Sequence, residues 1–219
     1  MTVRLHVWRV RPTAVPRALW GMAVDRRRLC RDATFVKLLG TGRGGEFGAG
    51  KADLTRWAAL VVGDAAVTPP MRGVTASCVV TLEPVASRGT WAGRAPFDGM
   101  LVHPPKTEGM IAVLTRARLK ARKAPAFWKA IDPVSRALPG ADGMICAFGI
   151  GEAPVGFQGT VSLWRSAADV VRFAYRQPEH AAVVDRTGRE GWYAEELFAR
   201  FRVLDVTGDR EVIGWRDSP

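Results

Sequence analysis

The sequence is poor in cysteine and has no long apolar run. Cys30, Cys78 and Cys146 are odd in number and widely spaced, and no Cys-x-x-Cys pair exists. This pattern argues against a disulfide framework and a cysteine metal site, and it predicts reduced thiols in the cytoplasm. No apolar stretch approaches the roughly 18 residues that a membrane-spanning helix needs. The N-terminus alternates charged and apolar residues, so we do not expect a signal peptide.

Acidic residues are also scarce. The chain has 21 of them against 32 lysines and arginines, and its net charge is +11. A basic surface can meet nucleic acid, anionic lipid, an acidic protein or an anionic cofactor, or it can simply be solvated. The sequence contains no helix-turn-helix, zinc-finger or RNA-recognition motif, so nucleic acid is not an expected partner. Peripheral contact with an anionic membrane stays open.

A glycine-rich run at residues 40–52, GTGRGGEFGAGKA, contains two overlapping nucleotide-binding patterns. A Walker loop needs a hydroxyl after its lysine to hold magnesium, and here that position is Ala52. The segment that follows turns quickly into a strand and leaves no long helix whose N-terminus could face a phosphate. We therefore predict a hairpin loop, or a lid over a cavity, rather than a phosphate site.

The apolar periodicity predicts an α+β fold of two similar halves. The expected strands are 2–10, 33–40, 55–63, 75–89, 109–120, 143–150, 156–164 and 199–208, and the expected helices are 13–29, 124–138, 166–177 and a segment that runs on from Pro178 to the last strand. The order fits two tandem ferredoxin-like units, 1–93 and 109–219, joined by a proline-rich connector at 94–108. Their sheets would face each other in a dimeric α+β barrel-type pseudo-dimer, with the helices outside.

Some strand faces carry polar residues whose direction decides their role. A period of two puts Arg116 on one face with Ala112 and Leu114, opposite Ile111 and Val113. An arginine inside a barrel is costly unless it is paired, so Arg116 either meets a ligand there or lies on a partly solvated face. Lys37 raises the same question.

The next polar face lies on the strand at 156–164. That face carries Gln158, Thr160, Ser162 and Trp164. It either lines a pocket or is the solvent-exposed side of the sheet. Phe148 is expected in the core with contact to a pocket. Glu152 could bond the backbone or anchor an arginine.

Several stretches together resemble the spheroidene monooxygenase family, the acyclic carotenoid 2-ketolases. They are ATFVKLLGTG (33–42), GRAPF (93–97), AVLTRA (112–117), FGIGEAPVGFQGTVSLW (148–164), FAYRQPEH (173–180) and EGWYAEELFARF (190–201). This resemblance implies a dimeric α+β barrel-like fold, haem b as the iron cofactor, dioxygen as oxidant and ferredoxin as electron donor. A fainter likeness joins RQPEHAAVV to the haem-ligand segment of the haem-containing aldoxime dehydratases, and on that likeness His180 is the iron ligand.

The chain has three histidines, so few residues can serve as an axial ligand. His6 is expected in the first strand with its ring nitrogens hydrogen-bonded, and His103 precedes two prolines in the connector. His180 shares an apolar helical stripe with Val183 and Val184, which turns it inward. From the residues alone it is either a core histidine bonded to a carbonyl or a ligand; the resemblance favours the ligand.

With the haem placed in the C-terminal unit, the resemblance gives the polar and aromatic residues of these strands their roles. The expected cofactor contacts are His180, Arg116, Phe148, Trp164 and Ser162, and the expected catalytic residues are Arg116 and Gln158. Tyr193 and Glu195 are expected in an amphipathic packing helix with no role in the chemistry.

The function expected is that of a haem-dependent monooxygenase acting on a small apolar substrate such as a carotenoid. The alternatives are a haem-dependent dehydratase that acts on an N–O bond, with iron as a Lewis acid, and a haem-binding protein without turnover. The sequence leaves open whether the protein is a monomer or a homodimer.

Overall fold

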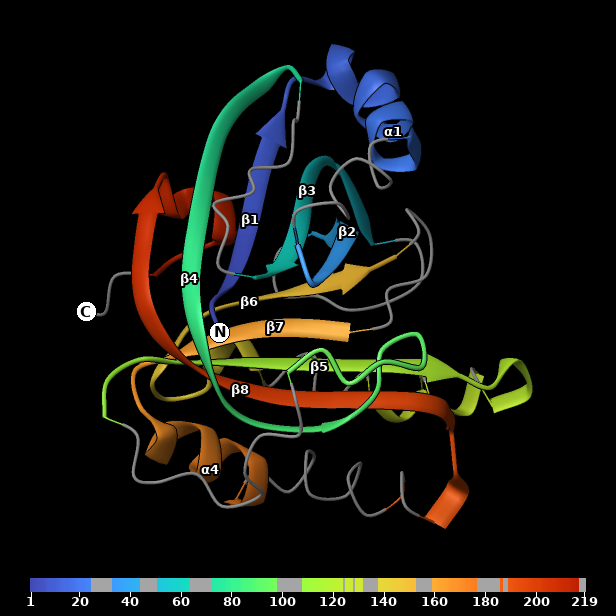
Figure 1. Cartoon of the computed structure of the whole chain (residues 1–219). Helices are drawn as coiled ribbons and strands as arrows, with labels where there is room; N and C mark the ends of the chain where they lie inside the picture. Colours follow the sequence, from blue (N-terminus) through green and yellow to red (C-terminus); the bar gives the residue numbers. More distant parts are fainter. Residues whose placement is uncertain are drawn as a thin grey trace.

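Eight antiparallel strands close into a barrel (Figure 1). The computed structural model describes residues 1–24, 33–43, 51–63, 72–97, 108–123, 125–127, 129–131, 138–152, 159–176, 186 and 189–216. The strands are β1 (Val3–Val10), β2 (Phe35–Gly42), β3 (Ala52–Val62), β4 (Val74–Gly89), β5 (Ile111–Leu119), β6 (Met144–Gly151), β7 (Gly159–Trp164) and β8 (Tyr193–Gly208). The helices that the structure describes from end to end are α1 (Val15–Val24), α4 (Ala167–Arg176) and the short 3-10 helices η1 (Pro12–Ala14), η2 (Ala121–Lys123), η3 (Leu138–Gly140) and η4 (Arg210–Ile213).

The barrel consists of two half-sheets with the same strand order. In the first half the order is β4-β1-β3-β2, and in the second half it is β8-β5-β7-β6. Each half therefore has the strand arrangement of a ferredoxin-like unit. The halves join through a short β2–β6 pairing and a long β4–β8 pairing that runs from Cys78 to Gly89 on β4. This confirms the predicted fold of two ferredoxin-like units in one barrel.

The barrel interior is filled by the apolar residues of alternating strand positions. On β1 these are Val3, Leu5 and Val7, all fully buried in the central core, while Trp8 and Val10 pack on the outer side. Each apolar side chain buried in this way stabilises the fold by about 1.5–3 kcal/mol. Because side chains alternate between the two faces of a strand, the buried apolar residues also show which way the charged residues of the same strand point.

Helices cover the outer faces of the two half-sheets, as predicted. The first half is covered by α1, whose Ala18 packs in the cluster that contains Trp57. Over the second half lie α4 and the helical residues 125–127 and 129–131. Ser166 caps the start of α4: its Oγ accepts a hydrogen bond from the Asp169 backbone N–H at 3.2 Å and its hydroxyl donates to Asp169 Oδ2 at 2.7 Å. No helix in the described part of the chain is long and apolar enough to span a membrane.

The structure bears on the predictions for residues 193–198 and for the glycine-rich run. Residues 193–198 were expected in a helix, and this was wrong: they begin β8, where Glu195, Leu197 and Ala199 alternate with outward residues and pair with β5. The glycine run does join a hairpin, since Gly42 pairs with Ala52 across β2 and β3. Residues 44–50 of that run lie outside the described residues, so the lid remains a prediction.

Candidate functional site

Arg116 points into the barrel. It follows Ala112 and Leu114 on the inner face of β5, and only 4% of its surface is exposed. The sequence left open whether this arginine faced inward or lay on a solvated face, and the structure decides for the interior. A buried guanidinium needs partners, because an unpaired charge in a protein interior is strongly unfavourable.

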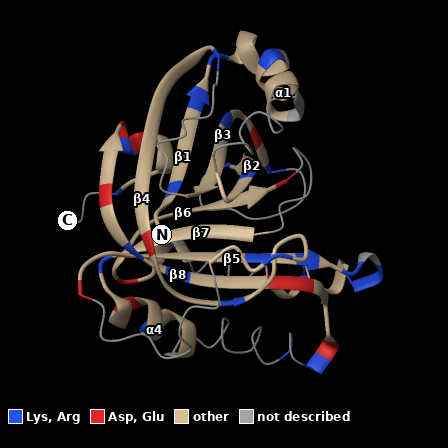
Figure 2. Ribbon diagram, viewed as in Figure 1, with Lys and Arg blue, Asp and Glu red and all other residues tan. Residues whose placement is uncertain are grey.

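Two carboxylates and a second cation surround Arg116. Its guanidinium pairs with Glu195 on β8 and, at 3.2 Å, with Glu152 just after β6. Glu152 also accepts a hydrogen bond of 2.5 Å from Nζ of Lys37 on β2. We call Lys37, Arg116, Glu152 and Glu195 the charged cluster. Figure 2 shows basic residues on β5 beside acidic residues on β8 and after the tip of β6.

The cluster lies at the end of the barrel where β4, β5 and β6 finish and β8 begins, which we call the Trp91 end. Trp91 follows β4 and is fully buried in the central core. Lys37 Nζ and the Arg116 guanidinium carbon each lie 5.5 Å from the centre of a Trp91 ring. Such distances allow attraction between each cation and the indole face.

A tight turn holds Trp91 in this position. Oε1 of Glu195 accepts hydrogen bonds from the Thr90 hydroxyl at 3.0 Å and the Gly93 backbone N–H at 2.8 Å. Ala92 between them has a φ of 55°, a left-handed conformation that a residue with a Cβ adopts at a cost of about 1 kcal/mol. One carboxylate thus anchors both Arg116 and the turn that carries Trp91.

The cluster keeps both carboxylates ionised. Burial raises the pKa of Glu195, but hydrogen bonds from Gly93, Arg116 and Thr90 outweigh it and lower that pKa to about 2. Burial also raises the pKa of Glu152, and the hydrogen bond and charge of Lys37 hold it below its ordinary value. With two cations and two carboxylates, the cluster is electrically neutral as a whole.

Two N–H groups of this site are buried and poorly paired. Within the described residues, Nε of Arg116 has no hydrogen-bond partner. Nε1 of Trp91 interacts with the Glu152 carboxylate at less than ideal hydrogen-bond geometry and helps to lower its pKa. A cleft of about 280 Å³ opens beside the cluster, and residues 33–37, Ala92 and Arg94 line it.

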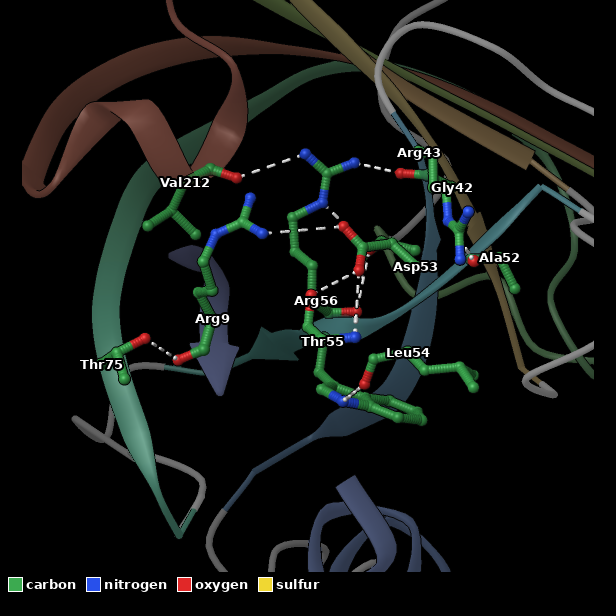
Figure 3. A network of polar contacts seen from close by, with 12 residues as sticks. Arg9, Gly42, Arg43, Ala52, Asp53, Leu54, Thr55, Arg56, Thr75 and Val212 are labelled. Atoms are coloured by element: carbon green, nitrogen blue, oxygen red, sulfur yellow. Dashed lines mark hydrogen bonds and ion pairs between the residues drawn. The ribbon is translucent and has the colours of Figure 1, made fainter. Parts of the chain in front are cut away.

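The opposite end of the barrel has a different kind of buried arginine (Figure 3). Arg56 on β3 is 4% exposed and donates to three neutral oxygens: the Thr41 hydroxyl at 3.0 Å, the Val212 carbonyl at 3.3 Å and the Gly42 carbonyl. Its guanidinium carbon lies 5.1 Å from the centre of the Phe148 ring. Val212 and Ile213 of η4 complete the apolar core at this Arg56 end.

The predicted cofactor contacts lie on two sides of one sheet. Arg116 and Phe148 are inside the barrel. Ser162 and Trp164 are buried on the outer face, where the Trp164 N–H donates to Ser162 Oγ at 2.8 Å and the Trp164 ring lies 5.3 Å from Phe173 of α4. The structure therefore brings Ser162 and Trp164 together but separates them from Arg116 and Phe148.

The structure describes only some of the remaining predicted residues. Gln158, His103 and His180 lie outside the described residues, so their roles remain predictions. His6 is buried on the outer face of β1 and stacks on Trp8 at 5.7 Å. Neither of its ring nitrogens has a hydrogen-bond partner, so the expectation of a satisfied sheet histidine was wrong.

Sequence reasoning missed three residues of the two barrel ends. Glu195 was assigned to a helix, although its alternation with Leu197 and Ala199 indicates a strand. Trp91 lies between Gly89 and Gly93, a pattern that is typical of a tight turn. This pattern does not predict that the Trp91 side chain is buried. Arg56 could have been found from its period-two spacing to Ala58 and Leu60, both inside the barrel.

Comparison with known proteins relates the whole chain to one group of sequences. The chain is 32% identical over 212 residues to the spheroidene monooxygenase of Rhodobacter capsulatus, with 90% of this chain and 87% of that protein covered. The spheroidene monooxygenase of Rubrivivax gelatinosus is 30% identical over 187 residues, with 80% and 71% covered. No protein-family model matches the chain.

Among solved structures, an aldoxime dehydratase in complex with butyraldoxime is similar in fold. Its TM-score with this chain is 0.54 at 12% sequence identity, with 93% of this chain and 79% of that one covered. At this identity the likeness concerns the fold alone.

Proposed function

Because the chain belongs to the spheroidene monooxygenase family, we propose that it is a haem-dependent monooxygenase that acts on an acyclic carotenoid. In each round one atom of dioxygen enters a C–H bond as a hydroxyl, the other leaves as water with two protons, and reduced ferredoxin supplies the two electrons. A ketone at the same carbon requires a second round and loss of water from the resulting gem-diol. The observation that carries the proposal is 32% identity over 90% of the chain, rather than a match confined to one motif.

The described residues inside the barrel do not fit a haem. Apolar side chains fill the interior between the two ends, and both terminal nitrogens of Arg116 already bind carboxylates. Phe148 is fully buried beneath the guanidinium of Arg56. No step of the reaction is therefore assigned to a haem in this interior.

The haem is proposed instead on the outer side of the second half. That face carries Ser162 and Trp164, and α4 covers it. His180, the proposed axial ligand, follows α4 in the sequence, and Gln158, the proposed catalytic residue, precedes β7. When bound, haem supplies an iron whose axial ligand and surroundings set its reactivity toward dioxygen.

A visible spectrum of the purified protein after haem reconstitution tests the cofactor. We expect a Soret band of histidine-ligated haem, which His180→Ala should abolish or shift. His103→Ala is the matched control and should leave the band unchanged. No Soret band in the wild-type protein would overturn haem dependence, and the reverse result for the two variants would assign the iron to His103.

Turnover of spheroidene under ¹⁸O₂, with reduced ferredoxin, tests the reaction. We expect product that carries the heavy isotope, detected by mass spectrometry, and no product without oxygen or reductant. Turnover of an aldoxime that persists without oxygen would reject the monooxygenase and support a dehydratase.

A further inference from the structure

The outer side of α1 carries a tryptophan that the protein does not bury. Trp20 is 72% exposed, whereas Trp8 and Trp57 are buried in the cluster that the same helix covers. An indole is a large, mainly apolar group with a polar N–H, and residues of this kind are enriched where a protein meets another phase or another molecule. The exposed indole of Trp20 therefore marks a surface to be explained.

The packing of α1 fixes the direction in which Trp20 points. Ala18 is buried in the outer cluster of the first half, and Leu19 packs against that cluster. Residues three and four apart share one side of a helix, so Trp20 lies on the same side as the exposed residues Pro16 and Arg17. Trp20 could turn toward the barrel only if Ala18 left its buried position. The helix thus holds the indole outward.

The charges around the exposed indole have one sign. Residues 11–24 contain Arg11 and Arg17 but no Asp or Glu. Arg72 adds a third cation beside them, because its neighbour Gly73 accepts a hydrogen bond of 3.1 Å from the Arg11 backbone N–H. All three arginines are exposed, and in Figure 2 α1 carries basic but no acidic colour. This face therefore combines an aromatic residue with uncompensated positive charge.

A second exposed aromatic residue lies in different surroundings. Tyr175 on α4 is also 72% exposed. Its neighbour Arg172 pairs with Asp169 of the same helix at 3.0 Å, so the positive charge there is balanced. Figure 1 shows α1 and α4 far apart on the barrel, so one flat surface cannot contact both. The charge pattern selects α1.

An anionic lipid surface matches both parts of the α1 face. Indole rings favour the headgroup level of a bilayer, and arginines beside them are attracted by anionic headgroups. With ten residues, α1 is about 15 Å long, half of what crossing a bilayer requires, so it would lie along the surface. An acidic protein could use the same charges and is the alternative that an experiment must separate.

We propose that α1 docks the protein on anionic lipid bilayers. The Trp20 indole enters the headgroup layer, and Arg11, Arg17 and Arg72 contact lipid phosphates. This inference goes beyond the proposed function and does not rest on it, because docking requires neither haem nor a carotenoid.

Co-sedimentation with two kinds of vesicle tests the proposal. One kind is phosphatidylcholine alone, and the other is an equal mixture of phosphatidylcholine and phosphatidylglycerol. We expect the wild-type protein to bind the anionic vesicles about a hundredfold more tightly, since each of three arginines near the surface contributes about fivefold. Arg17→Gln should weaken this binding about fivefold, and Trp20→Ser should weaken it about tenfold. Both side chains are exposed, so neither change should unfold the protein.

Tyr175→Ser is the matched control, because it removes an equally exposed aromatic side chain from α4, and it should leave binding unchanged. Vesicles with brominated acyl chains should quench part of the tryptophan fluorescence of the wild-type protein but not of Trp20→Ser. Equal binding of wild type and Trp20→Ser, or a loss confined to Tyr175→Ser, would overturn the proposal.

A wild-type protein that binds neither kind of vesicle would also overturn the proposal. If an acidic ferredoxin then bound the wild-type protein but not Arg17→Gln, the α1 face would belong to a protein partner instead. None of these measurements involves haem or turnover, so the proposed function would still stand.

Discussion

The two ends of the barrel pair a buried arginine in different ways. Each end buries an arginine that points into the barrel, Arg116 at one end and Arg56 at the other. Arg56 donates from all three of its nitrogens to neutral oxygens of the chain. Arg116 gives two nitrogens to carboxylates and keeps the third unpaired within the described residues.

This difference separates an arginine whose three nitrogens are all paired from one that keeps a nitrogen unpaired. The Arg56 end is satisfied by the protein itself and is completed by η4, so its contacts account for the stability of that end. The Trp91 end contains the unpaired Nε of Arg116 among the described residues, a strained residue and an adjoining cleft. Burial and charge alone would not have distinguished the two arginines; their hydrogen-bond partners do.

The largest effect is expected from alanine at two glycines of the β4–β8 pairing, where an added Cβ would clash with the neighbouring strand. A Cβ on Gly89, at the Trp91 end, would lie 2.1 Å from the Glu196 carbonyl oxygen, and a Cβ on Gly208 would lie 2.3 Å from the Ser77 oxygen. Both residues have positive φ, near 90°. Each substitution should lower the free energy of unfolding by about 4 kcal/mol, measured by urea denaturation.

The two ends should separate in the effect on the Trp91 turn. Gly89 immediately precedes Thr90 and Trp91, so Gly89→Ala should also displace that turn and change the tryptophan fluorescence of the folded protein. Gly208→Ala is the matched control at the other end of the β4–β8 pairing and should leave the fluorescence nearly unchanged. Equal changes in both variants would mean that the clash at Gly89 does not act through the Trp91 turn.

A smaller loss is expected when each arginine is replaced by methionine. Arg116→Met leaves the Glu195 carboxylate without its cation, which should cost about 3 kcal/mol of stability. Arg56→Met leaves three neutral oxygens without a donor, which should cost about 2 kcal/mol. Urea denaturation of the two variants measures both values.

The double variant Arg116→Met with Glu195→Gln identifies the cause. Removing the charge of Glu195 should restore part of the lost stability, because no uncompensated carboxylate then remains. A double variant no more stable than Arg116→Met alone would show that lost packing, not charge, explains the effect.

Local patterns in the sequence were sufficient for the strands but not for the partners. The period of two on β5 placed Arg116 on the same face as Ala112 and Leu114, but it left open whether that face pointed into the barrel. Its partners Glu152 and Glu195 lie 36 and 79 residues away in the sequence, and only the closed barrel brings them together.

Glu195 shows how a local pattern can mislead. Its segment, WYAEELFARF, has apolar residues at spacings that suit either a helix or a strand. Pairing with β5 on one side and β4 on the other selects the strand. Tertiary contacts therefore decided the structure of the segment that supplies the central carboxylate of the site.

His6 tests whether an unpaired buried group is by itself a sign of function. Both of its nitrogens are unpaired, yet it lies on the outer face of β1, away from the charged cluster. Burial, helped by the charge of Arg4, lowers the pKa of His6 from 6.5 to about 4. The unfolded chain therefore takes up a proton more readily than the folded protein, and the stability that His6 allows above pH 6.5 is lost as the pH falls toward 4.

From pH 7 to pH 5 this loss should amount to about 2 kcal/mol in the wild-type protein. His6→Leu should remove that part of the pH dependence, measured by urea denaturation at both pH values. The unpaired nitrogens of His6 would then be explained by their effect on stability. An unchanged pH dependence in His6→Leu would show instead that another group titrates between pH 5 and pH 7.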